Sequence, residues 1–278
     1  MPFRISHCYC IVILLLLFAL PVSAIAAEPR TNTLAVVPNL PAVTLHKNWT
    51  PFVEELSREL GVKIELKLYE KINSFLDETN AGAADFIYSA PNMFFLAHQK
   101  QKYIPLVRSS ETIRGLVFVR KDSPYIKVSE LRGKTIAFVG PKNICSVITR
   151  HSILTGQGAI DYNAFFSGST INVAKSVLLG KADAGATLDT SMLTDLPEML
   201  NEFRIILETE KIAPHPLAAH PRVPKKLQEA MTAAVLAMDK SDRGRRMLQT
   251  VKLSKPIKAD FKRDYAFFGS IDLGGFDK

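Results

Sequence analysis

Hydrophobic positions along the chain follow two periods that alternate with one another. Between residues 49 and 60, apolar side chains recur at helical spacing with charged residues on the opposite side, and Gly61 marks the expected helix end. Between residues 62 and 68, apolar and polar residues alternate, which is typical of a strand with one solvated face. A short apolar strand at residues 33–37 precedes both segments. The pattern therefore predicts a strand, a helix and a strand in succession.

The next elements predict a buried strand that leads into a loop. A helix is expected at residues 72–80, and the apolar strand after it opens with Asp85. This strand ends in Ser89, Ala90 and Pro91, which are small or turn-forming residues. Ligands bind outside the carboxyl ends of strands in open α/β sheets, so this loop is a candidate ligand site.

A second set of elements repeats this plan, with Asp183 at the head of another buried strand and Asp189 in the polar turn after it. Strands are expected at residues 116–120, 135–139, 165–166 and 205–207, and helices at residues 143–154, 224–238 and 243–248. The mature length of about 250 residues exceeds what one compact core usually holds. No linker or repeat array divides the chain. The sequence therefore predicts an α/β protein of two lobes that share chain crossings.

The first residues predict export. Arg4 precedes an unbroken apolar run at residues 11–20, and small residues up to Ala26 follow it. The run is about half as long as the roughly twenty residues of a transmembrane helix, so we expect a cleavable signal peptide at residues 1–26, with an uncleaved anchor as the alternative. Two cysteines lie before the run and not at its end, which argues against a lipid anchor.

Composition favours an anionic ligand and argues against nucleic acid. Without the signal, 34 Lys and Arg against 27 Asp and Glu leave a formal charge of +7. These basic residues are scattered and form no patch. Cys145 is the only cysteine of the mature chain, so no internal disulfide can form and stability must come from the apolar cores.

The motifs, in their order, resemble those of the phosphate/phosphite/phosphonate-binding subfamily of periplasmic substrate-binding proteins. The similarity spans nearly the whole mature chain and is carried by W-x-P-F-x-x-x-L at residues 49–56, G-x-x-D-F-I-Y-x-x-P at 82–91, L-R-G-K-T-I-A-F-V-G-P at 131–141, F-F-S-G-S at 165–169 and L-L-G-K-A-D-A-G-A at 178–186. The resemblance implies a class II Venus flytrap: two lobes, each a mixed sheet flanked by helices, close around a ligand in the cleft between them. Residues 27–116 and 213–278 would form lobe 1 and residues 117–212 lobe 2, with crossings near 115–119 and 207–214.

A compact oxyanion needs hydrogen-bond donors, which the N-terminus of a helix supplies. The turn of Asn143, Cys145 and Ser146 starts the predicted helix where the family carries small hydroxyl residues, and a plain capping turn is the alternative. Ser169 and Thr170 cap the next helix. Thr170 stands where phosphonate binders carry a His, and its hydroxyl can donate but supplies no cation.

Five further residues complete the candidate ligand site, each with a structural alternative. Tyr88 and Ser89 end the buried strand of lobe 1, and Tyr69 follows an earlier strand; each could line the cleft or pack. Asp189 and His215 fall in the segments where aminophosphonate binders place acids for the ammonium group. Asp189 is offset and His215 is no acid, so an aminoalkyl phosphonate is disfavoured. A turn cap and a partly exposed turn residue are the respective alternatives.

Cys145 carries a separate hypothesis. At a helix N-terminus its sulfur could bind a thiophilic species such as arsenite, as in sensing members of the wider family, or it could be a small buried hydrophobe.

The leading hypothesis is a monomeric periplasmic protein that captures a small oxyanion (phosphonate, phosphite or phosphate) and presents it to an ABC permease. The alternative is the sensing partner of a membrane histidine kinase. An enzyme is not expected, because no nucleophile–base pair, phosphate loop or metal-spaced His/Cys cluster occurs, and we expect no cofactor or metal.

Overall fold

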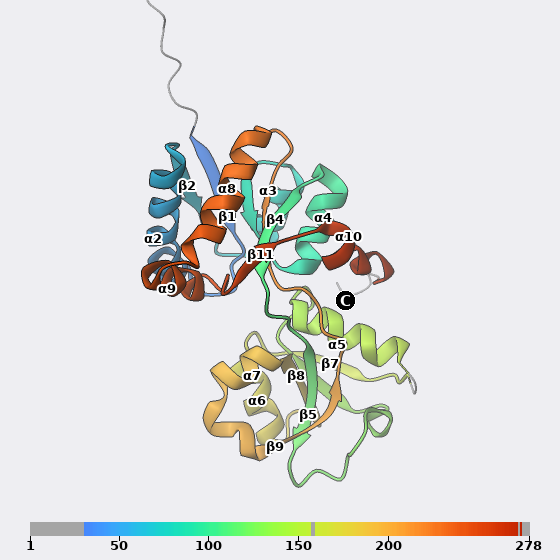
Figure 1. Ribbon diagram of the computed structural model, residues 1–278. Coiled ribbons are helices and arrows are strands. Elements are labelled where there is room, and N and C mark those ends of the chain that lie inside the picture. The colour runs from blue at the N-terminus through green and yellow to red at the C-terminus, as the bar shows by residue number, and fades with distance from the viewer. Residues whose placement is uncertain (1–30, 157–158, 272, 274–278) are drawn as a thin grey trace, which may run out of the picture. The chain divides into compact units, whose positions relative to one another are not determined.

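The computed structural model describes residues 31–156, 159–271 and 273, so the predicted signal peptide at residues 1–26 lies outside the described residues. The described chain forms two mixed sheets flanked by helices (Figure 1), which confirms the predicted fold class. Among the described residues, no helix combines the length and apolar character that crossing a membrane requires.

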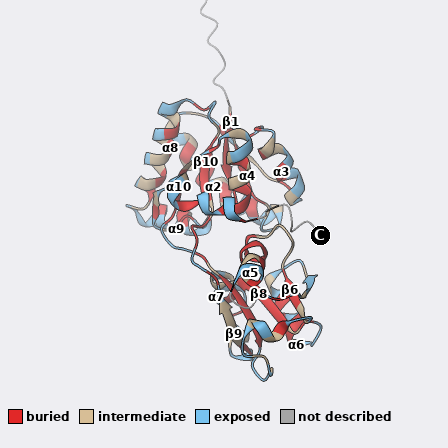
Figure 2. Ribbon diagram, turned by 90° about the vertical axis from the view of Figure 1, so that its right-hand side faces the viewer, coloured by how far each residue is buried: buried red, intermediate tan, exposed pale blue. Residues whose placement is uncertain are grey.

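The first sheet has the strand order β11-β4-β10-β3-β1-β2. Strands β1, β2 and β3 are parallel, whereas β10 runs antiparallel to both β3 and β4, and β11 antiparallel to β4. Leu34, Ala35 and Val36 of β1 are all fully buried, so both faces of the sheet are covered. Figure 2 shows these buried strands between helices. The strands are β1 (Asn32–Val36), β2 (Ile64–Lys67), β3 (Phe86–Tyr88), β4 (Ile104–Ser109), β10 (Pro216–Ala219) and β11 (Pro256–Lys258), and the helices are α2 (Ala42–Leu60), α3 (Ile72–Asn80), α4 (Pro91–Gln101), α8 (Lys225–Met238), α9 (Asp242–Thr250) and α10 (Phe261–Asp264).

The second sheet has the order β7-β6-β8-β5-β9, with β6, β7 and β8 parallel and β5 antiparallel to both β8 and β9. Side chains along β5 alternate between two apolar clusters, since Leu116 and Phe118 enter one and Val117 and Val119 the other. This sheet is therefore also buried on both faces. Its elements are β5 (Gly115–Arg120), β6 (Thr135–Phe138), β7 (Asn163–Phe166), β8 (Ala184–Leu188), β9 (Phe203–Glu208), α5 (Ile144–Thr155), α6 (Thr170–Leu178) and α7 (Asp189–Asp195).

Two chain segments connect the sheets, at residues 110–114 and 209–215. They pair with one another, because Ile113 and Ile212 each donate a backbone hydrogen bond to the other's carbonyl, at 3.0 and 2.8 Å. Residues 115–119, expected as a crossing, lie inside β5. The predicted lobe boundaries at 116/117 and 212/213 stay a prediction.

Helix α5 contributes to two apolar cores at once. Ile144, Val147 and Ile148 belong to the cluster built mainly around the first sheet, whereas Cys145 and Ile153 belong to a cluster of the second sheet. The helix that carries much of the candidate site is thus fixed from two sides.

Candidate functional site

All ten candidate residues lie at the ends of sheets where ligands bind in α/β proteins. Strands β1, β2 and β3 end at one edge of the first sheet, and β10, which is antiparallel to β3, begins there. Strands β6, β7 and β8 end together at one edge of the second sheet. At or next to these ends lie Tyr69, Tyr88, Ser89 and His215 in the first sheet and Asn143, Cys145, Ser146, Ser169, Thr170 and Asp189 in the second.

The two aspartates that open buried strands lie at the opposite edges and have a structural role. Asp85 accepts a hydrogen bond from the backbone N–H of Thr33 at 3.0 Å, and its other oxygen pairs with Arg222 at 2.8 Å. In the second sheet, Asp183 accepts from the backbone N–H of Thr135 at 2.9 Å. Each carboxylate therefore caps the start of the neighbouring parallel strand.

The first turn of α5 is capped as the sequence indicates. The side chain of Asn143 accepts a hydrogen bond from the backbone N–H of Cys145 at 2.9 Å. Ser146 is fully buried, and its hydroxyl has no hydrogen-bond partner among the described residues. A buried hydroxyl without a partner costs free energy, so its presence at a helix N-terminus suits a ligand contact.

Cys145 lies away from water, in an apolar cluster with Val117, Val119 and Phe138. It is 2% exposed, and burial raises the pKa of its thiol well above the ordinary value. The neutral thiol is therefore the favoured form at physiological pH. This environment fits a small, packed hydrophobic side chain better than a thiolate that binds a thiophilic species such as arsenite.

A polar contact that the sequence did not reveal joins the two sheets beside this turn. Helix α4 starts directly after Ser89 and Ala90, and Asn92 in its first turn donates from Nδ2 to the carbonyl of Lys142 at 3.0 Å. The ammonium of Lys142 in turn donates to Oδ1 of Asn73, in the first turn of α3, at 3.3 Å. The N-termini of α3, α4 and α5 therefore meet at Lys142.

Tyr88 and His215 form part of an aromatic stack. The rings of Tyr88 and His215 are stacked with centroids 5.5 Å apart, and Trp49 packs 4.7 Å from Tyr88. The Tyr88 hydroxyl donates to the carbonyl of Lys252 at 3.4 Å. Burial lowers the pKa of His215 to about 4, so this imidazole is neutral at pH 7 and brings no positive charge to the site.

The remaining candidates of the first sheet engage local partners. Ser89 donates from its hydroxyl to the carbonyl of Ala90 at 3.3 Å, and it is 1% exposed. The Tyr69 hydroxyl donates to Glu78 at 3.0 Å, and Lys67 also pairs with that carboxylate. Burial, followed by the adjacent Glu78, raises the pKa of Tyr69, so its phenol stays protonated.

At the edge of the second sheet, Ser169 caps α6 by accepting from the backbone N–H of Asn172 at 3.2 Å, and Thr170 is half-buried in the first turn. Asp189 accepts from the backbone N–H groups of Thr190 and Arg114 at 2.7 and 3.3 Å. Its second oxygen lies 3.6 Å from Nε of Arg114, which also pairs with Glu208. The Asp189 carboxylate is therefore matched by a cation of the protein itself.

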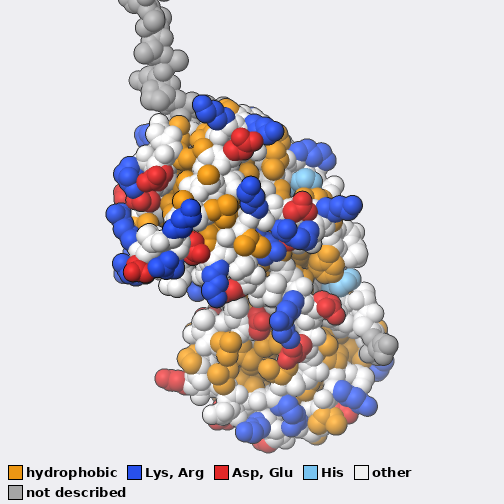
Figure 3. Space-filling model, viewed as in Figure 1, with side chains coloured by type: hydrophobic (Ala, Val, Ile, Leu, Met, Phe, Trp, Pro, Cys, Tyr) orange, Lys and Arg blue, Asp and Glu red, His pale blue; other side chains and the backbone are white. Residues whose placement is uncertain are grey.

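Neither the distribution of surface charge nor a cluster of metal-binding side chains marks a further site on the described residues. On the face shown in Figure 3, Lys and Arg side chains are interspersed with Asp and Glu. Among the described residues, no group of three or more His, Cys, Asp or Glu side chains could hold a metal ion.

The sequence model of the periplasmic substrate-binding proteins of phosphonate ABC transporters matches residues 34–265. The chain belongs to this family. Its members are periplasmic substrate-binding proteins that serve transport, which confirms the resemblance seen in the motifs.

Solved structures share this two-lobed fold at low sequence identity. PhnD1 from Prochlorococcus marinus, in complex with methylphosphonate, is 16% identical with a TM-score of 0.74, and the similarity covers 89% of this chain and 98% of that one. XAC2383 from Xanthomonas citri, bound to ATP, is 15% identical with a TM-score of 0.74, covering 88% and 96%. PA3383 from Pseudomonas aeruginosa, a binding protein component of an ABC phosphonate transporter, is 12% identical with a TM-score of 0.62, covering 84% and 82%.

Proposed function

We propose that this family member captures a small oxyanion of the phosphonate, phosphite or phosphate type at the carboxyl edges of its two sheets. Presentation of the loaded protein to an inner-membrane ABC permease is the second part of the proposal. It follows from the family, whose members supply ABC transporters.

The charge pattern of the helix N-termini carries this proposal. Six helices, α2 to α7, each follow a strand that ends at one of these edges. Acidic residues are normally favoured in the first turn, where they offset the positive end of the helix dipole. Yet α2, α3, α4, α5 and α6 have none there. The exception is α7, whose Asp189 is paired with Arg114. The positive ends of these helix dipoles are therefore available to interact with a bound anion.

The surroundings of Asp189 and Cys145 also narrow the class of anion that the site would bind. Aminoalkyl phosphonates carry an ammonium group that needs a carboxylate, and Asp189 is occupied by Arg114. A thiophilic ligand such as arsenite, one of the ligands considered for the sensing alternative, would need the sulfur of Cys145, which is buried as a neutral thiol. Both observations favour a compact oxyanion without a cationic group.

Thermal unfolding of the mature protein against phosphate, phosphite, methylphosphonate, aminoethylphosphonate, sulfate and arsenite tests the proposal. A ligand that binds only the folded state stabilises it by about 2.7 kcal/mol at a concentration one hundred times Kd. We expect a rise in Tm with at least one phosphorus oxyanion. No shift with any compound of the series would reject oxyanion capture.

Ser146→Ala separates binding from folding in the same assay. Because the Ser146 hydroxyl is buried without a partner, its removal should leave the ligand-free Tm unchanged or higher, while affinity falls about tenfold. Ser152→Ala, six residues further along α5, is the matched control and should preserve affinity. Equal affinity of the Ser146 and Ser152 variants would remove Ser146 from the site.

A further inference from the structure

Lys142 occupies the point where three helices begin. It lies in the loop between β6 and α5, its carbonyl accepts from Asn92 of α4 at 3.0 Å, and its ammonium donates to Asn73 of α3 at 3.3 Å. Asn73 and Asn92 are each the second residue of their helix. Side chains from the first turns of α3 and α4 thus hold both ends of a residue that precedes α5.

The electrostatic setting of Lys142 is positive from several directions. The N-caps of α3 and α4 make no side-chain capping hydrogen bond, and neither helix, nor α5, has an acidic residue in its first turn. The positive ends of three helix dipoles therefore converge at Lys142, and none of the three first turns carries an acidic residue. Helix N-termini arranged in this way are suited to binding an anion.

Asn92 adds an acceptor to this cluster of donors. Its Nδ2 is used by the Lys142 carbonyl, which fixes the orientation of the amide because Oδ1 in that place would face another acceptor. Asn92 is 4% exposed, and its Oδ1 has no hydrogen-bond partner among the described residues. An unpaired buried acceptor at an anion site is satisfied by a ligand that brings a proton of its own.

We propose that Lys142 and Asn92 together determine ligand specificity, Lys142 by charge and Asn92 by accepting a hydrogen bond from a protonated ligand oxygen. The ligand class is then an oxyanion that keeps a hydroxyl near neutral pH, such as hydrogen phosphate, hydrogen phosphite or a hydrogen alkylphosphonate. Sulfate, which carries no proton at that pH, is rejected because it leaves the Asn92 oxygen unpaired. This inference rests on the proposed function and refines it.

The assignment also accounts for the cation that the other candidates do not supply. Thr170 has a hydroxyl, and His215 is neutral at pH 7. Lys142 is half-buried, so its ammonium can move from Asn73 toward an anion without leaving the junction. Asn73 is then the positioning residue that holds the ammonium in place between binding events.

Isothermal titration calorimetry of the mature protein with inorganic phosphate, phosphite, methylphosphonate and sulfate tests the pair. For the wild type we expect at least one phosphorus oxyanion to bind about tenfold or more tightly than sulfate. Lys142→Met should weaken that ligand by about 10- to 100-fold, whereas Lys142→Arg, which keeps the charge, should retain most of the affinity. Asn92→Ala should reduce the preference over sulfate to less than about threefold.

Matched controls distinguish a local effect from a general one. Lys225→Met removes a charge from a side chain that is 88% exposed on α8, and Asn80→Ala removes an unpartnered amide oxygen at the far end of α3. Neither should change affinity or selectivity. Asn92→Ser and Lys142→Gln replace any variant whose circular dichroism shows that it does not fold.

The outcomes separate this inference from the proposed function. A wild type that binds none of the four anions would overturn both. A wild type that binds a phosphorus oxyanion, but binds sulfate equally well or keeps its affinity in Lys142→Met, would preserve oxyanion capture and reject the specificity roles given to Lys142 and Asn92.

Discussion

At the scale of single residues, several polar side chains of the candidate site make hydrogen bonds that stabilise the fold itself. Asn143 and Ser169 cap their helices, and Tyr69 donates to Glu78. Each of these three side chains therefore has a structural role in the described protein. Capping does not exclude ligand contact, since a cap uses one acceptor and leaves the N–H groups of the first turn available.

The buried imidazole of His215 leads to a prediction about how the stability of the protein depends on pH. Because burial lowers its pKa to about 4, below the ordinary 6.5, the unfolded chain binds this proton more readily than the folded protein does. The stability contribution is complete above pH 6.5 and is lost as the pH falls toward 4. His215→Gln should therefore reduce the loss of unfolding free energy over that range, by an amount on the order of 1–3 kcal/mol.

The measurement is urea unfolding of both proteins at pH 7.5 and pH 4.5. His46→Gln, at an exposed position of α2, is the matched control and should follow the wild type at both values. If the His215 variant loses as much stability as the wild type on acidification, the buried imidazole does not titrate as described.

Residue-scale contacts were also the least predictable from sequence. Asn143, Ser146 and Ser169 follow from capping rules and motif position, because caps are local. Asn92 and Lys142 meet although they are 50 residues apart, and no local pattern reports such a contact. It depends on how two helices from different sheets approach each other.

At the scale of elements, most strands and helices were predicted within a few residues. Helix α3 coincides with the expected residues 72–80, and α2 ends at Gly61, which has the left-handed φ of 63° that glycine tolerates best. Helix α4 was missed because Pro91 was interpreted as a turn residue that ends the buried strand and opens a loop. Proline is also favoured in the first turn of a helix, and that rule prevails at Pro91.

The packing of α5 against Gly115, the first residue of β5, leads to a second prediction. A Cβ at Gly115 would lie 2.4 Å from Cγ2 of Thr149 on α5, so Gly115→Ala forces α5 and the start of β5 apart. We expect a loss of about 1–3 kcal/mol in unfolding free energy. Thr149→Ser removes the clashing methyl group and keeps the hydroxyl that bonds to the carbonyl of Cys145.

Chemical denaturation of the two single variants and the double variant provides the check. The double variant should recover part of the stability lost in Gly115→Ala, giving a non-additive cycle. Additive losses would mean that Thr149 is not the group that excludes a side chain at this position.

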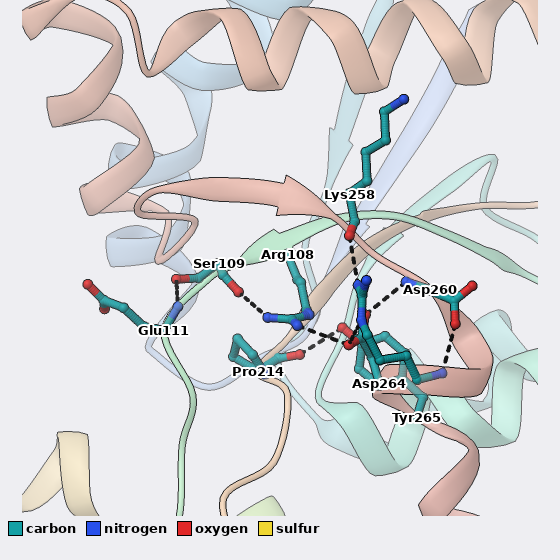
Figure 4. Close-up of polar contacts among 9 residues, drawn as sticks. Arg108, Ser109, Glu111, Pro214, Lys258, Asp260, Asp264 and Tyr265 are labelled. Carbon is teal, nitrogen blue, oxygen red and sulfur yellow. Dashed lines mark hydrogen bonds and ion pairs between the residues drawn. The ribbon is translucent and has the colours of Figure 1, made fainter.

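At the scale of the whole molecule, the C-terminal segment contacts both β4 and the crossing at residues 209–215 (Figure 4). Arg108 of β4 pairs with Asp264 of α10 at 2.9 Å, and the hydroxyl of Tyr265 donates to the carbonyl of Pro214 at 3.0 Å. Burial alone would raise the pKa of Asp264, but hydrogen bonds from Arg263 and Arg108 outweigh it and lower the pKa to about 2. This carboxylate stabilises the fold above its ordinary pKa, and the stabilisation fades as the pH falls toward 2.

Removal of this charge is the third prediction. The side chains of Asp264 and Arg108 are 3% and 10% exposed, so Asp264→Asn leaves a buried guanidinium without its counter-charge and should cost about 3–5 kcal/mol. Asp242→Asn, where the carboxylate is 80% exposed and paired with Arg245, should change stability far less, because water screens an exposed ion pair. Equilibrium unfolding at pH 7 compares the two, and equal small losses would show that the Arg108 pair is not structural.

The position of β10 has a consequence for the order in which the two sheets can fold. Strands β3 and β4 are consecutive in sequence, yet β10, with residues 216–219, lies between them. A nascent chain that has reached residue 208 already holds every strand of the second sheet, whereas the first sheet still consists of the three strands β3-β1-β2 and the separate strand β4, with open edges between them. The second sheet can therefore form before the first sheet, which is completed only when β10 and β11 have been synthesised.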